Sequence, residues 1–210
     1  MSKFDIHTVY KTQDGEKVPS VTTVLNVLAK PALIYWAWDL GIKGIDYRKY
    51  RDDKADIGTL VHKQILDHLR GQVTTPKEYT LEQLTTAEIC FNKYMEWESK
   101  QQLEPVLLEA QLVSEKYKFG GTLDNYCKLD GVPTLVDYKT SKAIYEEYFY
   151  QLAGYKILLE EHGHSVKQCL ILRIGRDETE GFEVCKRENL DIEEQIFLKC
   201  VEIYHLKGGI

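Results

Sequence analysis

Cysteines are few in this chain, and their spacing excludes several kinds of site. The 210 residues contain five cysteines, an odd number, and no two of them form a C-x-x-C pair. A disulfide framework or a zinc knuckle is therefore not expected. An iron–sulfur cluster is not expected either, because it would need four suitably placed cysteines. We predict free, buried thiols, at Cys90, Cys127, Cys169, Cys185 and Cys200.

Long apolar runs and targeting patterns are also absent. No apolar run approaches the roughly 18 residues that a membrane-spanning helix requires, so no membrane partner is expected. The first twenty residues lack the charged-then-apolar pattern of a secretory signal. Internal repeats and low-complexity tracts are missing as well. These absences predict an intracellular protein, which we place in the cytoplasm, with one globular domain over residues 1–210.

Positive charge is in the minority, but it is unevenly distributed. The chain has a formal net charge of −6, with 27 basic and 33 acidic residues. Residues 1–70 hold 11 basic against 9 acidic residues, whereas the rest of the chain is strongly acidic. An acidic total therefore does not exclude a local basic surface, and some of the acids are available for a metal site.

The hydrophobic spacing predicts helices in the first half of the chain and mixed elements in the second. Helices are expected after Ser20 and over residues 31–41, 55–71 and 80–101, with Ser20 and Thr80 as caps and Gly41 as a stop. Strands are expected over 105–114, 118–131, 133–141, 167–175 and 181–187, and helices over 145–161 and 190–206. This order indicates a mixed α/β (α+β) fold, with a mainly helical lobe over residues 1–103 and a sheet-containing core over 104–210.

An aspartate and a lysine interrupt the apolar strand "TLVDYKTS". Asp137 and Lys139 share one face of an extended strand, and a hairpin would bring Asp124 near them. Neighbouring carboxylates repel each other and favour a hard cation such as Mg²⁺ or Mn²⁺. With an ammonium that orients water, this set suits metal-assisted hydrolysis of a phosphodiester. The alternative is a chance D-x-K forming an exposed ion pair.

Four further side chains are candidates for the same site. His62 lies on an apolar helix face, where it is either a metal ligand or a satisfied core histidine. Glu109, in "LLEAQL", either adds a carboxylate or is an exposed strand residue. Gln151 and Tyr155 share a helix face. A buried amide at Gln151 needs partners, whereas Tyr155 also fits simple core packing.

Five motifs occur in a fixed order and together resemble a known family. They are "GTLVH" ending at His62, Glu109, "GGTLD" ending at Asp124, "VDYKTS" with Asp137 and Lys139, and "QLAGY" with Gln151 and Tyr155. This set resembles the PD-(D/E)XK nuclease superfamily, in its RecB-like exonuclease branch. The segment "PSVTTVL", followed by "KPALIYWAWDLG", is similar to phage-encoded exonucleases and to the mitochondrial genome maintenance exonuclease. The resemblance covers about residues 18–205.

Two departures from the family pattern are visible. The proline of the superfamily name is absent, and Leu123 precedes Asp124. The four cysteines of the family's iron–sulfur members are also missing. The missing cysteines point away from an iron–sulfur cluster. The resemblance itself implies a restriction-endonuclease-like core, in which helices flank a central mixed sheet, together with an N-terminal helical lobe.

The resemblance also implies roles for the site residues. His62, Asp124, Asp137 and the backbone carbonyl of Tyr138 would bind Mg²⁺ or Mn²⁺. Lys139 would position the attacking water, and Glu109 would support the site through metal-bound water.

Other residues would brace the site or touch DNA. Gln151 and Tyr155 belong to this group, as do the hydroxyls at a predicted helix start, Ser20, Thr22 and Thr23. Tyr35 or Trp36 could stack on a base, although core packing is the favoured explanation of both.

The resulting expectation is a metal-dependent DNA exonuclease that prefers single strands and acts in recombination, repair or replication of a bacterial or phage genome, with recombination or replication proteins as partners. A flap or junction endonuclease of the same superfamily is one alternative. A non-catalytic DNA-binding or docking module is another, and a structural protein with exposed ion pairs is a third.

Overall fold

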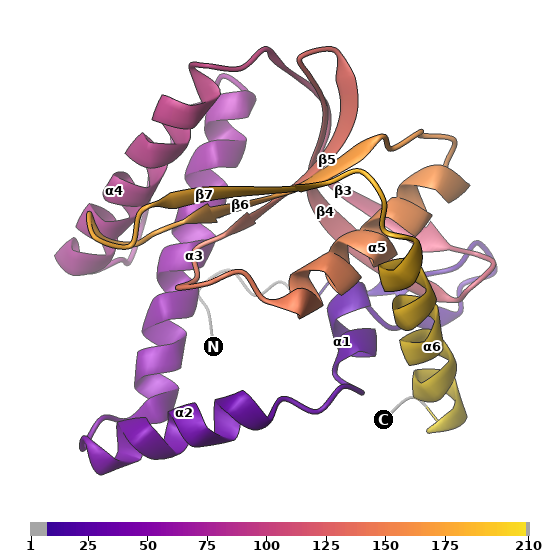
Figure 1. Ribbon diagram of the computed structural model, residues 1–210, viewed down its shortest axis with the longest axis horizontal. Coiled ribbons are helices and arrows are strands. Elements are labelled where there is room, and N and C mark those ends of the chain that lie inside the picture. The colour runs from indigo at the N-terminus through magenta and orange to yellow at the C-terminus, as the bar shows by residue number, and fades with distance from the viewer. Residues whose placement is uncertain (1–7, 209–210) are drawn as a thin grey trace.

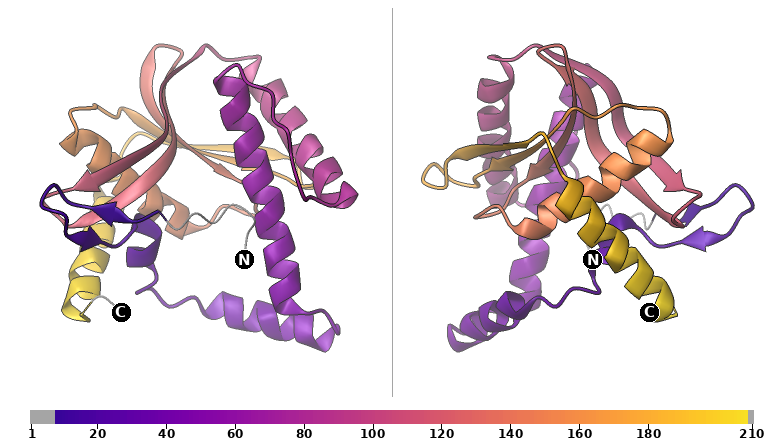
Figure 2. Two further views of the ribbon diagram at one scale, coloured as in Figure 1. Left: turned by 180° about the vertical axis from the view of Figure 1, so that it is seen from behind. Right: turned by 45° about the vertical axis from the view of Figure 1, so that its right-hand side comes forward.

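A computed structural model describes residues 8–208 and contains six helices and seven strands in this range (Figure 1). The chain begins with a hairpin of β1 (Tyr10–Lys11) and β2 (Lys17–Val18), which encloses the turn-forming "QDG". Figure 2 shows this hairpin beside the ends of two longer strands. The expected turn-rich stretch over residues 1–19 lies partly outside the described residues.

A five-stranded sheet in the order β3-β4-β5-β6-β7 forms the centre of the molecule. Its strands are β3 (Leu103–Ser114), β4 (Phe119–Leu129), β5 (Val132–Lys139), β6 (Gln168–Ile174) and β7 (Phe182–Arg187). The pair β5–β6 is parallel and the other three pairs are antiparallel. Because a parallel pair needs a crossover, α5 (Glu146–Glu161) connects β5 to β6. The predicted mixed fold is confirmed.

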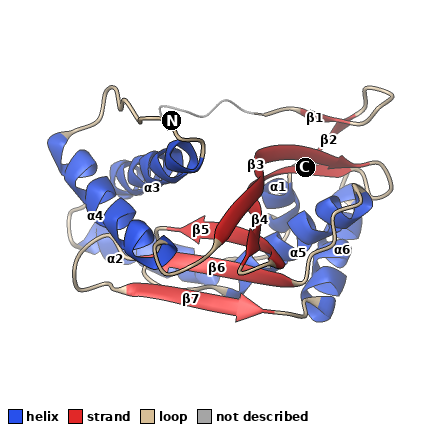
Figure 3. Ribbon diagram, turned by 90° about the horizontal axis from the view of Figure 1, so that it is seen from above, coloured by secondary structure: helices blue, strands red, loops and turns tan. Residues whose placement is uncertain are grey.

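Helices cover both faces of this sheet. One hydrophobic core lies between the sheet and three helices, α1 (Val21–Leu25), α5 and α6 (Asp191–Leu206). A second core lies between the opposite face and two helices, α3 (Tyr47–Leu69) and α4 (Leu81–Glu98). Figure 3 shows the two helix groups on opposite sides of the strands. Alternation along β5 sends Leu135 into the first core and Val136 and Tyr138 into the second.

Local signals account for most of the helix boundaries. The Ser20 side chain accepts from the Thr23 amide and caps α1, and Thr80 and Gln83 form a complete capping box at α4. Both predicted caps are confirmed. The apolar spacing of Val21, Val24, Leu25 and Leu28 predicts a helix that reaches Leu28, but α1 ends at Leu25.

Two predicted helix boundaries are wrong. The third helix begins at Tyr47 rather than at residue 55, because the Asp46 carboxylate caps two backbone amides there. The helix α2 (Pro31–Ile42) runs past Gly41, and the positive φ of 70° comes later, at Gly44.

Among residues 8–208, no helix is long and apolar enough to span a bilayer. All five cysteines are free, and four of them are buried, whereas Cys185 is only half-buried. The expectation of buried thiols is thus wrong for Cys185 alone.

Candidate active site

The acidic pair and the lysine meet where β4 and β5 lie side by side. The Asp137 side chain is almost fully buried, and its Oδ2 lies 2.7 Å from Lys139 Nζ. Asp124, on β4, accepts a hydrogen bond of 2.9 Å from the Tyr138 amide. The expected convergence of Asp124 and Asp137 is therefore present, because the hairpin brings the two strands together.

Glycines allow other elements to approach these strands closely. A Cβ at Gly121, three residues before Asp124, would lie 2.7 Å from a ring carbon of Tyr155 on α5. A Cβ at Gly58 on α3 would lie 3.0 Å from Thr140 Oγ1, just after β5. Gly58 thus lets α3 pass close to the end of β5, and His62, one turn later, is carried to the same place.

His62, Glu109 and Asp124 form a compact cluster of possible metal ligands. One ligand atom from each residue lies within 4.8 Å of the others. His62 Nε2 lies 2.8 Å from the Tyr138 carbonyl oxygen, and His62 Nδ1 lies 3.5 Å from Asp124 Oδ1. Hard divalent ions take oxygen ligands at about 2.0–2.6 Å, so a small contraction would let these groups share one ion. The donor set fits Mg²⁺ or Mn²⁺, and the imidazole suits Mn²⁺ in particular.

Glu109 reaches this cluster through an unusual backbone conformation. Its φ is 50°, in a region that costs a non-glycine residue about 1 kcal/mol or more. The neighbouring pairs Leu108–Asn125 and Ala110–Leu123 place Glu109 across from Asp124. The half-buried side chain faces the site, so the alternative of an exposed strand residue does not hold.

The ionisable groups of the site strongly influence each other. Burial by itself would lower the pKa of His62, but the Asp124 carboxylate outweighs burial and raises this pKa to about 9. Burial raises the pKa of Asp137 to about 6, even though Lys139 acts against the increase. Burial likewise raises the pKa of Glu109, with a further contribution from Asp124. Without a metal, the carboxylates around His62 thus favour its protonated form, as they would favour any cation at this place.

Lys139 is held as a charged amine by several partners. Burial would lower its pKa, but Asp137 and Asp124 raise the pKa above the ordinary value. Its Nζ donates to Gln151 Oε1 at 3.0 Å, and the Gln151 amide donates to the Tyr155 hydroxyl at 2.8 Å. Of the predicted bracing pair, Gln151 therefore contacts the lysine directly, and Tyr155 supports Gln151.

Tyr148 also belongs to this site, although the sequence interpretation did not include it. Lys139 Nζ lies 5.0 Å from the centre of its ring, which is within the range of a cation–π interaction. The sequence does contain an indication of this role: Tyr148 stands three residues before Gln151, and this spacing places both on the same helix face.

The hydroxyl residues at the start of α1 bond mainly to one another. Ser20 Oγ lies 3.0 Å from Thr22 Oγ1 and 2.8 Å from Thr23 Oγ1. Thr22 also lines a groove of about 740 Å³ that extends to Gln151. Trp36 borders the same groove, whereas Tyr35 is 73% exposed, so core packing does not explain Tyr35.

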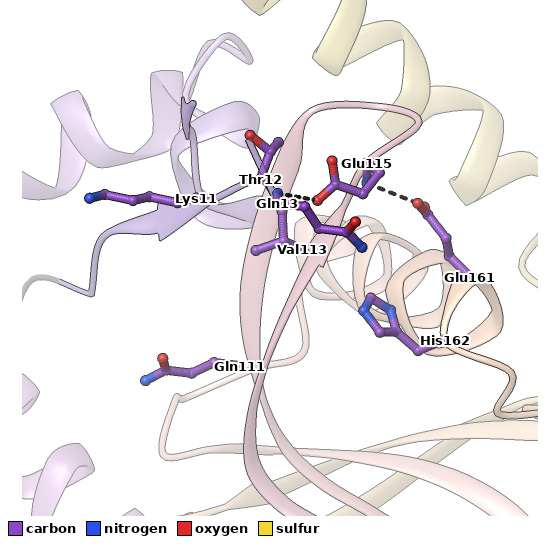
Figure 4. Close-up of a pocket in the computed structure, with 8 residues that line it drawn as sticks. All are labelled: Lys11, Thr12, Gln13, Gln111, Val113, Glu115, Glu161 and His162. Atoms are coloured by element: carbon purple, nitrogen blue, oxygen red, sulfur yellow. Dashed lines mark hydrogen bonds between the residues drawn. The ribbon is translucent and has the colours of Figure 1, made fainter. Parts of the chain in front are cut away.

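A second polar hollow, of about 520 Å³, lies beside the β1–β2 hairpin. Figure 4 shows Glu115, Glu161 and His162 among the residues around it. The Glu161 carboxylate accepts from the Ser114 hydroxyl at 2.6 Å, the Glu115 amide at 2.9 Å and the Lys116 amide at 3.2 Å. This carboxylate therefore organises the turn between β3 and β4.

Comparisons with known proteins support the fold. The chain matches no protein-family profile and has no significant match among curated protein sequences. A candidate exonuclease from Eubacterium rectale is similar in structure, with a TM-score of 0.50 and 15% identity over 73% of this chain and 69% of the other. An alkaline exonuclease from Laribacter hongkongensis aligns with a TM-score of 0.37 and 14% identity, over 72% of this chain and 83% of that chain. The first likeness supports the same mixed sheet and helix arrangement.

Proposed function

We propose that this protein is a metal-dependent DNA exonuclease of the PD-(D/E)XK type, in its RecB-like branch. One observation carries the proposal: the His62 imidazole and the carboxylates of Glu109, Asp124 and Asp137 converge beside the half-buried Lys139 at the end of β5. The fold shared with a candidate exonuclease adds support. An exposed ion pair does not explain the cluster, because Asp137 is 1% exposed and the Asp124 side chain is 14% exposed.

The metal would be held by His62, Glu109 and Asp124, with Asp137 and the Tyr138 carbonyl as further candidates. When bound, Mg²⁺ or Mn²⁺ would lower the pKa of a water molecule and offset charge on the phosphate. Glu109 as a direct ligand goes beyond the expected role through water, and the grouping of its carboxylate with His62 and Asp124 supports it.

Lys139 would act on the attacking water as a donor. An ammonium whose pKa is raised cannot accept a proton near neutral pH, so Lys139 is not the base. It would orient the water oxygen and stabilise the negative charge that develops on the phosphate. The Asp137 carboxylate, 2.7 Å from Lys139 Nζ, would accept the proton of that water. Water adds to phosphorus, and the bond to the leaving oxygen breaks.

The substrate would be a DNA end, with a preference for single strands. Helices α1, α2 and α3 line the groove that extends to Gln151, while β3, β4 and β5 carry the acidic residues of the site. Such an activity would serve recombination, repair or replication of a bacterial or phage genome, in the cytoplasm and alongside the proteins of these processes.

Digestion of end-labelled DNA tests the proposal. We expect linear single strands to be degraded with Mg²⁺ or Mn²⁺, circular single strands to survive, and EDTA to stop the reaction. Cleavage of circular single strands would identify an endonuclease instead. Absence of cleavage with either metal on every substrate would overturn the enzymatic proposal.

A further inference from the structure

A groove with its own chemistry adjoins the candidate active site. It has a volume of about 740 Å³ and is lined by residues of the α1–α2 connection, of α3 and of the segment that joins β5 to α5. Gln151 and Tyr148 line it, and both contact Lys139. Any chain that fills the groove therefore ends next to the catalytic amine.

Positive charge collects along this groove even though the whole chain is acidic. Five basic side chains line it and only one acidic side chain does so, namely Lys30, Arg51, Lys54, Lys142 and Arg176 against Glu147. Lys30 and Lys142 form no ion pair with any residue within 8–208, so their charge is available to a ligand. The net charge of the protein is −6, and this local excess of cations thus complements a polyanion.

Aromatic rings alternate with these cations. Trp36 is held edge-on by Tyr47 and Tyr50, with ring centres 5.3 and 5.9 Å away. On the opposite wall, Tyr145 is 47% exposed and lies edge-on to Tyr148 at 5.5 Å. Aromatic faces flanked by basic residues are typical of surfaces that bind unpaired nucleotides, because every base can stack on them.

The β6–β7 loop, which carries Arg176, is held in place by hydrogen bonds from Lys93. Lys93 on α4 donates to the carbonyl oxygens of Gly175 at 3.0 Å and of Gly181 at 3.5 Å. Its amine thus closes the loop between β6 and β7, and Arg176 stands on the groove side of that loop. The cationic wall is therefore built by tertiary contacts rather than by a flexible tail.

We infer that this groove holds the unpaired DNA strand next to the scissile phosphate, with bases stacked on aromatic side chains and phosphates held by the basic ones. The inference rests on the proposed nuclease function and adds the residues that select a single strand. A volume of this size suits one or two nucleotides rather than a paired helix. Stacking and flexible cations do not read base edges, so we expect no sequence preference.

Binding in EDTA tests the groove without cleavage. The probe is a fluorescent 20-nucleotide oligo-dT, compared with a 20-base-pair duplex, and the readout is anisotropy. The double variant Arg51→Gln/Lys54→Gln is matched by Lys186→Gln/Lys199→Gln, which removes the same charge from β7 and α6. All four side chains of the two variants pair with a nearby carboxylate.

We expect the groove variant to bind oligo-dT at least tenfold more weakly and to reduce the salt slope by about 1.4, since each lost phosphate contact contributes about 0.7. Tyr145→Leu should weaken binding about fivefold or more through lost stacking. The matched control should stay within twofold of the wild type. Equal binding by the groove variant and the control would overturn the inference.

Steady-state cleavage with Mg²⁺ separates this inference from the proposed function. The groove variant should raise KM for single strands with little change in kcat, because it removes uniform binding. A cleaving protein whose groove variant has wild-type KM would refute the groove and leave the nuclease proposal intact. A wild-type protein that never cleaves would refute the nuclease proposal and with it the role of the groove as a path to the site.

Discussion

Two clusters of side chains in this molecule contain carboxylates and a histidine, yet the carboxylates have different partners. Beside the β1–β2 hairpin, Glu161 accepts hydrogen bonds from one hydroxyl and two backbone amides. At the end of β5, the carboxylates of Glu109, Asp124 and Asp137 cluster with His62. Within residues 8–208, Asp124 alone among the three accepts a hydrogen bond from a backbone amide, that of Tyr138.

The difference shows how to separate a structural acid from a functional one. A carboxylate that accepts hydrogen bonds from several nearby donors already has its charge stabilised and needs no cation. Carboxylates that crowd together gain most from a cation, whether a proton on histidine, an ammonium or a metal ion. The hydrogen-bond donors around a group of acidic residues therefore distinguish a structural from a functional cluster better than the number of acidic residues does.

The comparison predicts the largest effects for the lysine and its aspartate. Asp137→Ala and Lys139→Ala should each reduce cleavage of linear single-stranded DNA by about a thousandfold or more, because they remove the proton acceptor and the charge that stabilises the reacting phosphate. Rates should be measured at saturating Mg²⁺ together with circular dichroism spectra. A folded variant that cuts at the wild-type rate would contradict the site assignment.

A smaller effect is expected for Glu109. Glu109→Gln keeps the size of the side chain but removes one charge from the cluster. Metal affinity should fall about 10- to 100-fold, as measured by calorimetry with Mn²⁺, and much of the activity should return at high metal concentration. Unchanged affinity would place Glu109 outside the metal site.

The histidine should link stability to pH in the metal-free protein. Its folded pKa of about 9 lies above the ordinary 6.5, so its ion pair with Asp124 stabilises the fold fully below about pH 6.5 and is lost as the pH rises through 9. The unfolding free energies of the wild type and His62→Gln in EDTA should differ by about 2 kcal/mol more at pH 6 than at pH 9.5. A difference that does not change with pH would contradict the pairing.

The smallest effect should come from the structural acid. Glu161→Gln should lower stability by about 1 kcal/mol, because a charged acceptor of backbone donors is replaced by a neutral one. This corresponds to about 2–4 °C in Tm. Cleavage at 25 °C should be unchanged. A large loss of activity without a change in Tm would contradict the assignment of Glu161 as a structural rather than a functional carboxylate.

Much of the fold was accessible from local patterns. Caps at Ser20 and Thr80, the hairpin turn before Val132 and the order of helices and strands are encoded by residues close together in the sequence. The start of α3 was missed because the stretch that follows Asp46 is rich in charge and lacks the apolar spacing of a helix that packs on the core.

The candidate site was only partly accessible in the same way. Lys139, Gln151 and Tyr155 could be grouped by strand and helix periodicity, and their contacts are present. The positive φ of Glu109 could not be predicted, because such a conformation persists only where surrounding structure enforces it.

The sequence by itself determined that Asp137 and Lys139 share one strand face and that Tyr138 between them enters the core, since side chains alternate along any extended strand. Only the tertiary structure decided that His62, 62 residues before Asp124 in the chain, lies beside it. It also decided that Lys30, Arg51 and Arg176 border one groove. These contacts depend on how α3 and the β6–β7 loop pack against the sheet, and packing is set by the whole chain at once.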